Sequence, residues 1–224
     1  MSQRRSPLVT SYFYHIFNRG VARQPTFLST YDYSHAELAL EYYEYFMPKI
    51  SLSRLKDQSL ERRQEVFANM RSGKKNVEII SYVFMPNHFH LLLKQTRENG
   101  ISEFMSQFSN SYTRYFNTKH NRVGPVFQGR FKSVLVESTE QLIHLSRYIH
   151  LNPVASAIIK EDKLFDYKWS SLRYYIQDLK ESFIVSEPVL SNFTSKEKYR
   201  EFILDHVGYS QALEKVKHLA LEEL

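Results

Sequence analysis

Hydrophobic and polar positions along the chain follow two different periods, which predicts a fold of mixed strands and helices. Runs rich in Tyr, Phe, Ile and Val, bounded by turn residues, indicate strands at residues 9–17, 77–85, 88–94 and 126–136. Only Pro86 and Asn87 separate the second run from the third. Proline fixes φ and asparagine tolerates turn geometry, so these two strands are expected to form a hairpin.

Between the strands lie segments with helical features. A long run without Gly or Pro extends from Ser29 to residue 46, and a highly charged, helix-permissive stretch covers residues 51–70. Apolar side chains recur at helical spacing over residues 101–116. The last of these helices should begin at Ser138, which forms a capping-box pattern with Gln141 three residues later.

We expect this last helix to stop near Asn152, because Pro153 disfavours helical geometry in the residue before it. The resulting order, β-α-β-β-α-β and then another helix, is typical of the ferredoxin-like split βαβ arrangement. The predicted fold class is therefore α+β, with an antiparallel sheet, a C-terminal helix after the last strand, and a helical extension. Two short helices are expected after Pro188.

Composition narrows the class of protein. The chain has 224 residues, 42% hydrophobic and 24% charged, which is ordinary for a globular protein with a core. No apolar run approaches the roughly 20 residues that span a bilayer, and no apolar signal region follows the basic N-terminus. The absence of cysteine excludes disulfides and thiolate metal sites. We expect a cytoplasmic protein without a membrane partner.

The charge is unevenly distributed. The net charge is +6, yet residues 181–224 carry a net −3, so the first 180 residues carry +9. This predicts a functional domain at 1–180 and an acidic helical extension at 181–224. Basic charge with 15% aromatic residues is compatible with single-stranded nucleic acid. On composition alone, a solvated basic surface over an aromatic core is the preferred interpretation.

Two histidines interrupt the apolar third strand. Residues two apart on a strand point to the same face, so His88 and His90 present their imidazoles side by side, roughly 6.5–7 Å apart at the backbone. Both rings could therefore converge on one cation, while Phe89, Leu91 and Leu93 point into a core. A single His-x-His is a weak signal, and two unrelated surface histidines are the usual explanation.

The last helix offers further candidates. Tyr148 and Asn152 lie one turn apart, on a different face from the apolar Leu142, Leu145 and Ile149. In a split βαβ sheet this helix can lie near the central strands, where a phenol, an amide oxygen and two imidazoles could meet. The alternative is that Tyr148 packs in the core and Asn152 marks the helix end; from the residues alone, this alternative is slightly favoured.

Four segments together resemble the REP-associated tyrosine transposases, single-tyrosine HUH endonucleases with an IS200-like transposase domain. The resemblance covers roughly residues 11–175, and the segments occur in the family's order. Each segment alone is unspecific, but the joint match is highly specific. The segments are YHIFNRG (14–20), YVFMPNHFHLL (82–92), PVFQGRFKS (125–133) and YIHLNPV (148–154).

The resemblance implies a set of roles. His88 and His90 would bind a divalent cation, Mg²⁺ or Mn²⁺, with Asn152 as a third ligand. Tyr148 would be the nucleophile that attacks a DNA phosphodiester, leaving a 5′-phosphotyrosine and a free 3′-OH. The expected substrate is single-stranded or hairpin DNA, and a homodimer is compatible with the sequence. The charged stretch at 51–75 is longer than a compact family member needs, and the acidic tail matches no family motif.

Four basic residues are candidates for holding the DNA backbone. Arg130 and Lys132 are two apart in the predicted fourth strand and should share a face, whereas Arg19 and Arg23, near the first turn, are weaker candidates. Solvated surface charge is the alternative for each of them. Three other tyrosines are expected to be structural: Tyr82 on a strand, and Tyr112 and Tyr115 on the apolar face of a helix.

Two other functions compete with the transposase hypothesis. A ferredoxin-like sheet with aromatic side chains could bind single strands without cutting them. A metal-dependent phosphohydrolase could instead use water, with Tyr148 as a spectator. A covalent protein–DNA adduct separates these classes, because only the transposase requires one.

Overall fold

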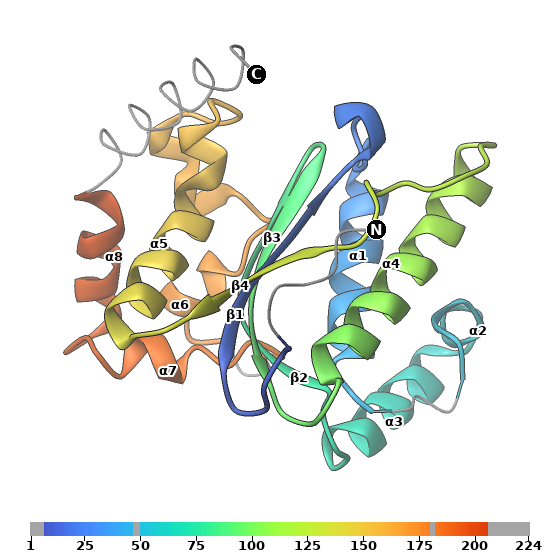
Figure 1. The fold of residues 1–224 in the computed structure, drawn as a ribbon, viewed down its shortest axis with the longest axis horizontal. Coiled ribbons are helices and arrows are strands. Elements are labelled where there is room, and N and C mark those ends of the chain that lie inside the picture. Colours follow the sequence, from blue (N-terminus) through green and yellow to red (C-terminus); the bar gives the residue numbers. More distant parts are fainter. Residues whose placement is uncertain (1–6, 47–49, 180–181, 206–224) are drawn as a thin grey trace.

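The computed structural model describes residues 7–46, 50–179 and 182–205. Its centre is a four-stranded sheet of β1 (Phe13–Arg19), β2 (Val77–Met85), β3 (His88–Gln95) and β4 (Lys132–Val136). The strands lie in the order β2-β3-β1-β4, and every neighbouring pair is antiparallel (Figure 1). This confirms the predicted ferredoxin-like fold, in which the first strand of the chain becomes an inner strand of the sheet.

Two strands are shorter than predicted, and positive φ angles account for both. Ser11 has φ of 71°, so the chain turns there and β1 begins only at Phe13. Gly129 has φ of 61°, and β4 therefore begins at Lys132. Before Gly129, Phe127 forms an isolated bridge with Gly20, directly after β1, and the Gln128 N–H donates to the Arg19 carbonyl oxygen at 2.7 Å.

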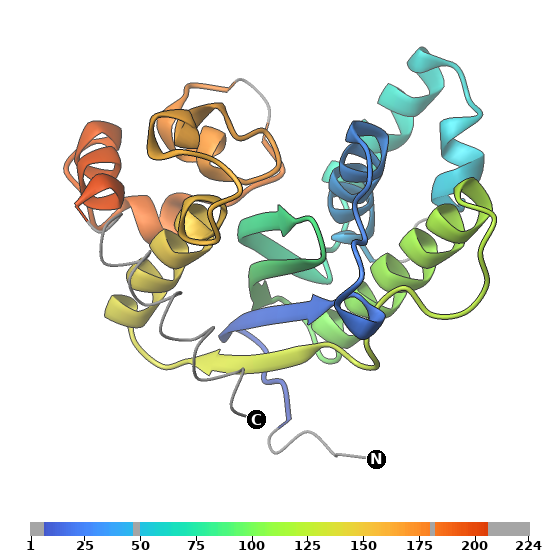
Figure 2. The ribbon, with the colours of Figure 1, turned by 90° about the horizontal axis from the view of Figure 1, so that it is seen from above.

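Helices pack against one face of the sheet. Figure 2 shows α1 (Thr30–Tyr43) and α4 (Gly100–Lys119) on one side of the strands, with α2 (Leu52–Lys56) and α3 (Leu60–Arg71) beyond them. The side chains between this layer and the sheet are mainly aromatic and fully buried, among them Phe84, Phe89, Phe108 and Tyr112. The predicted helix at 51–70 is thus two helices, separated at residues 57–59.

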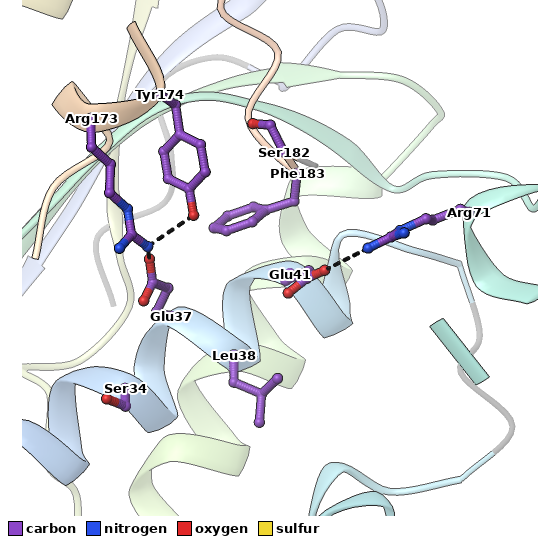
Figure 3. Close-up of a pocket in the computed structure, with 9 residues that line it drawn as sticks. All are labelled: Ser34, Glu37, Leu38, Glu41, Arg71, Arg173, Tyr174, Ser182 and Phe183. Carbon is purple, nitrogen blue, oxygen red and sulfur yellow. Dashed lines mark hydrogen bonds and ion pairs between the residues drawn. The ribbon is translucent and has the colours of Figure 1, made fainter. Parts of the chain in front are cut away.

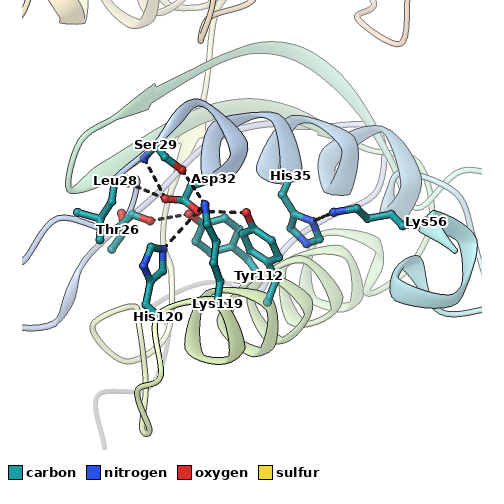
Figure 4. Close-up of polar contacts among 10 residues, drawn as sticks. Thr26, Leu28, Ser29, Asp32, His35, Lys56, Tyr112, Lys119 and His120 are labelled. Atoms are coloured by element: carbon teal, nitrogen blue, oxygen red, sulfur yellow. Dashed lines mark hydrogen bonds and ion pairs between the residues drawn. The ribbon is translucent and has the colours of Figure 1, made fainter.

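A polar cluster joins α1 to α4 (Figure 4). Asp32 is fully buried and accepts hydrogen bonds from the Leu28 and Ser29 N–H groups and from Lys119 Nζ at 2.7 Å. Burial alone would raise the pKa of Asp32, but the hydrogen bonds from Lys119 and the backbone outweigh it and leave the pKa below its usual value. A carboxylate at this position also caps the first turn of α1.

The same cluster attaches the charged segment around α2 to the core. Lys56 Nζ lies 3.2 Å from His35 Nδ1, and the His35 ring stacks on Tyr115 with ring centroids 3.8 Å apart. Burial, and then the positive charge of Lys56, lowers the pKa of His35 to about 4. His35 is therefore neutral at physiological pH, and its Nδ1 accepts a hydrogen bond from Lys56 Nζ.

The other face of the sheet is covered by α5 (Thr139–Ala155), which packs on β2 and β3 (Figure 2). Its start agrees with the prediction, because Ser138 Oγ accepts the Gln141 N–H at 3.1 Å. Its predicted end at Asn152 is wrong, because the helix continues through Pro153 to Ala155. Pro153 removes only one helical donor, and the burial of Leu151 and Val154 in the core stabilises the extra turn.

The chain after α5 covers the outer edge of β2. It forms η2 (Glu161–Asp166), α6 (Leu172–Ile176), α7 (Glu187–Leu190) and α8 (Lys196–Leu204). Hydrogen bonds from the backbone of residues 171 and 185 to Tyr82 and Ile79, and from Phe84 N–H to the Trp169 carbonyl, occupy the β2 edge. The two short helices expected near Pro188 are α7 and α8, although α7 already contains Pro188.

The proposed division at residue 180 stays a prediction, and residues 206–224 of the acidic extension lie outside the described residues. Among the described residues, none of the helices is both long and apolar enough to span a bilayer.

Candidate active site

The pairing of β1 with β3 gathers several histidines on the face that α5 partly covers. Phe17 pairs with His90 and Arg19 pairs with His88, so alternate residues of both strands point to the same side. The rings of His88 and His90 lie 5.1 Å apart between centroids and are perpendicular. His90 is buried and His88 is half-buried, which does not fit two unrelated surface histidines.

Tyr148 approaches these histidines from α5. Its half-buried ring lies 5.5 Å from the His90 ring between centroids, in an edge-on arrangement. The next residue, Ile149, is fully buried in the core and fixes the orientation of the helix. The structure therefore brings the predicted nucleophile to the predicted histidine pair, although 58 residues separate Tyr148 from His90 in the chain.

Asn152 follows one turn later on the same helix. Its side chain is 4% exposed, and no hydrogen-bond partner for Nδ2 is found among the described residues. A buried amide without a partner costs free energy, so its retention at this position is consistent with a functional role. Its role as a ligand stays a prediction.

His15 is a member of the cluster to which the sequence analysis assigned no role. Its Nε2 lies 2.9 Å from His90 Nδ1, and its ring centroid lies 6.1 Å from that of Tyr148. The signal in the sequence is the alternation along β1, where His15 interrupts a strand of Tyr, Phe and Ile. That signal indicates a site only once the register between β1 and β3 is known, because the register places His15 beside His90. The local sequence pattern does not specify this register.

The hydrogen bonds of the two candidate ligands fit metal coordination. His88 Nδ1 lies 2.6 Å from Asn87 Oδ1, and His90 Nδ1 lies against His15. A neutral histidine that donates from Nδ1 has its lone pair on Nε2, which can then coordinate a cation. For His90 this requires that the proton shared with His15 resides on His90.

The donor set is small. Within residues 7–46, 50–179 and 182–205, no cluster of three or more His, Asp or Glu side chains is arranged to hold a metal ion. A cation here would therefore rely on two imidazoles and a neutral third ligand such as Asn152. Such a set would leave coordination positions of the cation open to water and to phosphate oxygens.

Of the four basic candidates, two lie on the same face as the histidines: Arg19, which pairs with His88, and Lys132. Lys132 pairs with Phe17 in the sheet, and its Nζ lies 6.0 Å from the centre of the Phe17 ring. The prediction that Arg130 shares a strand face with Lys132 is wrong, because Arg130 precedes β4 and directly follows the turn at Gly129. Arg130 is exposed in that loop.

Arg19 and Arg23 are also exposed, at the end of β1 and in the short helix η1 (Val21–Arg23). Arg19 Nε donates to Gln128 Oε1 at 2.6 Å, which joins β1 to the loop that carries Arg130. The basic candidates are thus distributed over β1, β4 and two loops. Their DNA contacts stay a prediction.

A buried network holds α5, and with it Tyr148, against the sheet. Tyr199 of α8 lies 2.8 Å from His150 Nδ1, and His150 Nε2 lies 2.7 Å from Ser171 Oγ. Ser171 Oγ in turn accepts the N–H of Tyr82 on β2. Burial lowers the pKa of His150 to about 3, so the ring is neutral and links three elements by hydrogen bonds.

A separate pocket of about 320 Å³ opens between α1 and α6 (Figure 3). Glu37 pairs with Arg173, and Glu41 lies 3.7 Å from Arg71, so the charges in the pocket are balanced. None of the histidines described above, nor Tyr148, lines it. This pocket is therefore separate from the candidate active site.

A known family matches the part of the chain that carries this candidate site. The family model of IS200-like transposases matches residues 38–152, slightly more than half of the chain, and this span includes both histidines, Tyr148 and Asn152. The chain belongs to the IS200-like transposase family. Membership supports DNA cleavage at the level of the family, and no match was found among curated proteins.

Solved structures support the family fold. A REP-associated tyrosine transposase bound to a REP hairpin matches with a TM-score of 0.51 and 18% identity, over 79% of this chain and 86% of the other. At that identity the likeness shows the fold alone. The tRNA(His) guanylyltransferase of Saccharomyces cerevisiae matches over 92% of this chain and 82% of the other, but its TM-score of 0.33 at 10% identity is too low to support an inference.

Proposed function

We propose that this transposase family member is a metal-dependent single-strand DNA endonuclease and strand transferase that uses Tyr148 as its nucleophile. The observation that supports it most is the position of the Tyr148 ring, 5.5 Å from that of His90 and on the same side of the sheet as His88. A tyrosine that only packed in the core would have no need of two imidazoles against its ring, those of His15 and His90. Family membership supplies the reaction class.

The reaction follows from this placement. The Tyr148 oxygen attacks a DNA phosphorus, a Tyr–O–P bond forms, the P–O3′ bond breaks, and the phenolic proton is released as the 3′-OH is formed. A bound divalent cation, held by His88 and His90 with Asn152, would supply electrostatic stabilisation of the phosphate charge. The phosphotyrosine keeps the energy of the phosphodiester, so a second 3′-OH can reverse the step without ATP.

The proposed substrate is single-stranded or hairpin DNA. The basic candidates Arg19, Arg23, Arg130 and Lys132 are all exposed around the end of the sheet that carries His88. Phosphates are attracted by such a distribution regardless of base sequence. The similar solved transposase is bound to a REP hairpin, which supports hairpin DNA as the first substrate to test.

The experiment that tests this function compares Tyr148→Phe with the wild type. The substitution removes one oxygen and keeps the ring, so the fold and DNA binding should survive while covalent attachment to end-labelled hairpin DNA in Mn²⁺ disappears from a denaturing gel. Tyr112→Phe is the matched control, because Tyr112 is fully buried on α4 and donates to the Thr26 carbonyl. Adduct formation by Tyr148→Phe, or none by the wild type across many hairpins, would refute the proposal. The second outcome would favour a non-catalytic DNA binder.

A further inference from the structure

Asn87 connects the candidate metal ligand His88 to a loop on the other side of the turn. The residue lies in the two-residue connection between β2 and β3. Its Nδ2 donates to the carbonyl oxygen of Arg23 at 3.2 Å, and its Oδ1 lies 2.6 Å from His88 Nδ1. One amide therefore joins the loop after β1 to the imidazole of His88.

These two contacts determine which nitrogen of His88 carries the proton. A backbone carbonyl can only accept, so the Asn87 NH₂ group must face Arg23, and the amide oxygen must face His88. An amide oxygen also can only accept, so His88 must donate from Nδ1. The lone pair of the neutral ring then resides on Nε2, as metal coordination through that atom requires.

The backbone around Asn87 prevents the amide from moving away. The Asn87 carbonyl accepts the Gly20 N–H at 2.7 Å, and the Pro86 carbonyl accepts the N–H groups of Thr26 and Phe27 at 2.8 and 3.0 Å. Gly20 is itself confined, because a Cβ there would lie 2.2 Å from the Gln24 carbonyl oxygen. The turn and the loop thus form one bonded unit that presents the amide to His88.

We propose that Asn87 is a positioning residue that sets the tautomer and orientation of His88 and so increases the affinity of the site for a divalent cation. The inference rests on the proposed function, because that function makes His88 a ligand. Hydrogen-bond partners of metal-binding histidines typically contribute 10- to 100-fold to metal affinity. Asn87 itself touches neither the cation nor the DNA in this role.

Two substitutions separate the contact to His88 from the contact to the loop. Asn87→Ala removes both hydrogen bonds, whereas Asn87→Asp keeps an acceptor for His88 Nδ1 and loses the donor to the Arg23 carbonyl. Asn110→Ala is the matched control, because Asn110 is exposed on α4 and its amide donates to Ser106 Oγ on the same helix. Thermal melting of each variant establishes that it is folded.

The tautomer is measured without metal or DNA, by long-range ¹H–¹⁵N NMR on histidine-labelled protein, with His88 assigned from a His88→Gln sample. Mn²⁺ affinity is measured separately by electron paramagnetic resonance on DNA-free protein. We expect Asn87→Ala to lose the Nδ1–H form of His88 and to bind Mn²⁺ about 10- to 100-fold more weakly. Asn87→Asp should keep the tautomer and bind Mn²⁺ at least as tightly as the wild type.

Two results would overturn the inference. One is an unchanged tautomer and affinity in Asn87→Ala, and the other is an equal loss in Asn87→Asp, which would show that the amide acts through Arg23 alone. Neither result depends on DNA cleavage. If the wild type formed no adduct but Asn87→Ala still lost the tautomer and Mn²⁺ affinity, the proposed function would fail and the role of Asn87 would stand.

Discussion

Tyr199→Phe tests whether α8 holds the helix that carries Tyr148. The Tyr199 side chain is fully buried, and burial raises the pKa of its phenol well above the usual value, so the hydroxyl stays protonated. The pKa of His150 is lowered to about 3, so the ring is neutral. Because Ser171 Oγ donates to the Tyr82 carbonyl oxygen, His150 donates from Nε2 to Ser171 and accepts a hydrogen bond from the Tyr199 hydroxyl at Nδ1. Removing the hydroxyl leaves His150 Nδ1 buried without its donor.

An unsatisfied buried acceptor costs about 1–3 kcal/mol. The cavity left by one oxygen is small, so this cost should dominate the change in the free energy of unfolding. For a chain of this length each kcal/mol lowers the melting temperature by about 2–4 °C, so the variant should melt about 2–12 °C below the wild type. Covalent attachment to DNA should also slow, because α5 loses one of its connections to the rest of the fold.

The measurement is thermal and urea unfolding at neutral pH, with the adduct assay at a temperature where both proteins are folded. Tyr12→Phe is the control, because Tyr12 is 52% exposed and its substitution should stay within about 0.5 kcal/mol of the wild type. If Tyr199→Phe were as stable as this control, the hydrogen bond between the Tyr199 hydroxyl and His150 would not stabilise the fold, and the argument would be refuted.

Three other outcomes are expected. Affinity for hairpin DNA should fall steeply with salt, and reversing Arg130 and Lys132 to Glu should weaken binding and flatten that dependence in filter-binding titrations; a flat response of the wild type would indicate a non-electrostatic ligand. His88→Ala and His90→Ala should each abolish the DNA adduct, whereas EDTA should leave the melting temperature of the wild type nearly unchanged; unfolding in EDTA would instead indicate a structural metal. Because the pKa of His35 falls from 6.5 to about 4 on folding, the unfolded chain binds more protons between these values, and the wild type should lose stability as pH drops through this window. His35→Phe should lack the part of this loss that comes from His35, at most about 3 kcal/mol, and keep the part that comes from His150, whose pKa is lowered to about 3. Parallel stability curves for the two proteins would contradict the assignment.

The parts of the site that could be predicted are those governed by local pattern. The alternation around His88 and the Pro86-Asn87 turn specify a hairpin, and helical spacing places Tyr148 and Asn152 one turn apart. Both features depend on residues within a few positions of each other. Their meeting in space was predicted through the fold class and the family resemblance.

What could not be predicted depends on contacts between distant segments or on single backbone angles. The role of His15 requires the register between β1 and β3, and the role of Asn87 requires the loop at Arg23, more than 60 residues away. Gly129 has a positive φ, and Arg130 therefore lies before β4. Glycine permits this backbone angle, but the presence of a glycine does not predict it. At Pro153 the packing of α5 on the sheet prevails over the local preference.

The position of β1 inside the sheet has a consequence for synthesis of the chain. β3 and β4 both pair with β1 and not with each other, so β1 has no partner until the ribosome has passed residue 95 and gains its second only after residue 136. The helix with Tyr148 comes later still, and the segments that bond it in place, through Ser171 and Tyr199, follow it in the chain. A chain cut before Ser171 can therefore pair β1 with β3 and bring the histidines together, but it lacks the hydrogen bonds that hold α5 and Tyr148 in place. A polypeptide with the proposed chemistry would thus become able to break DNA only after Tyr199 has been synthesised.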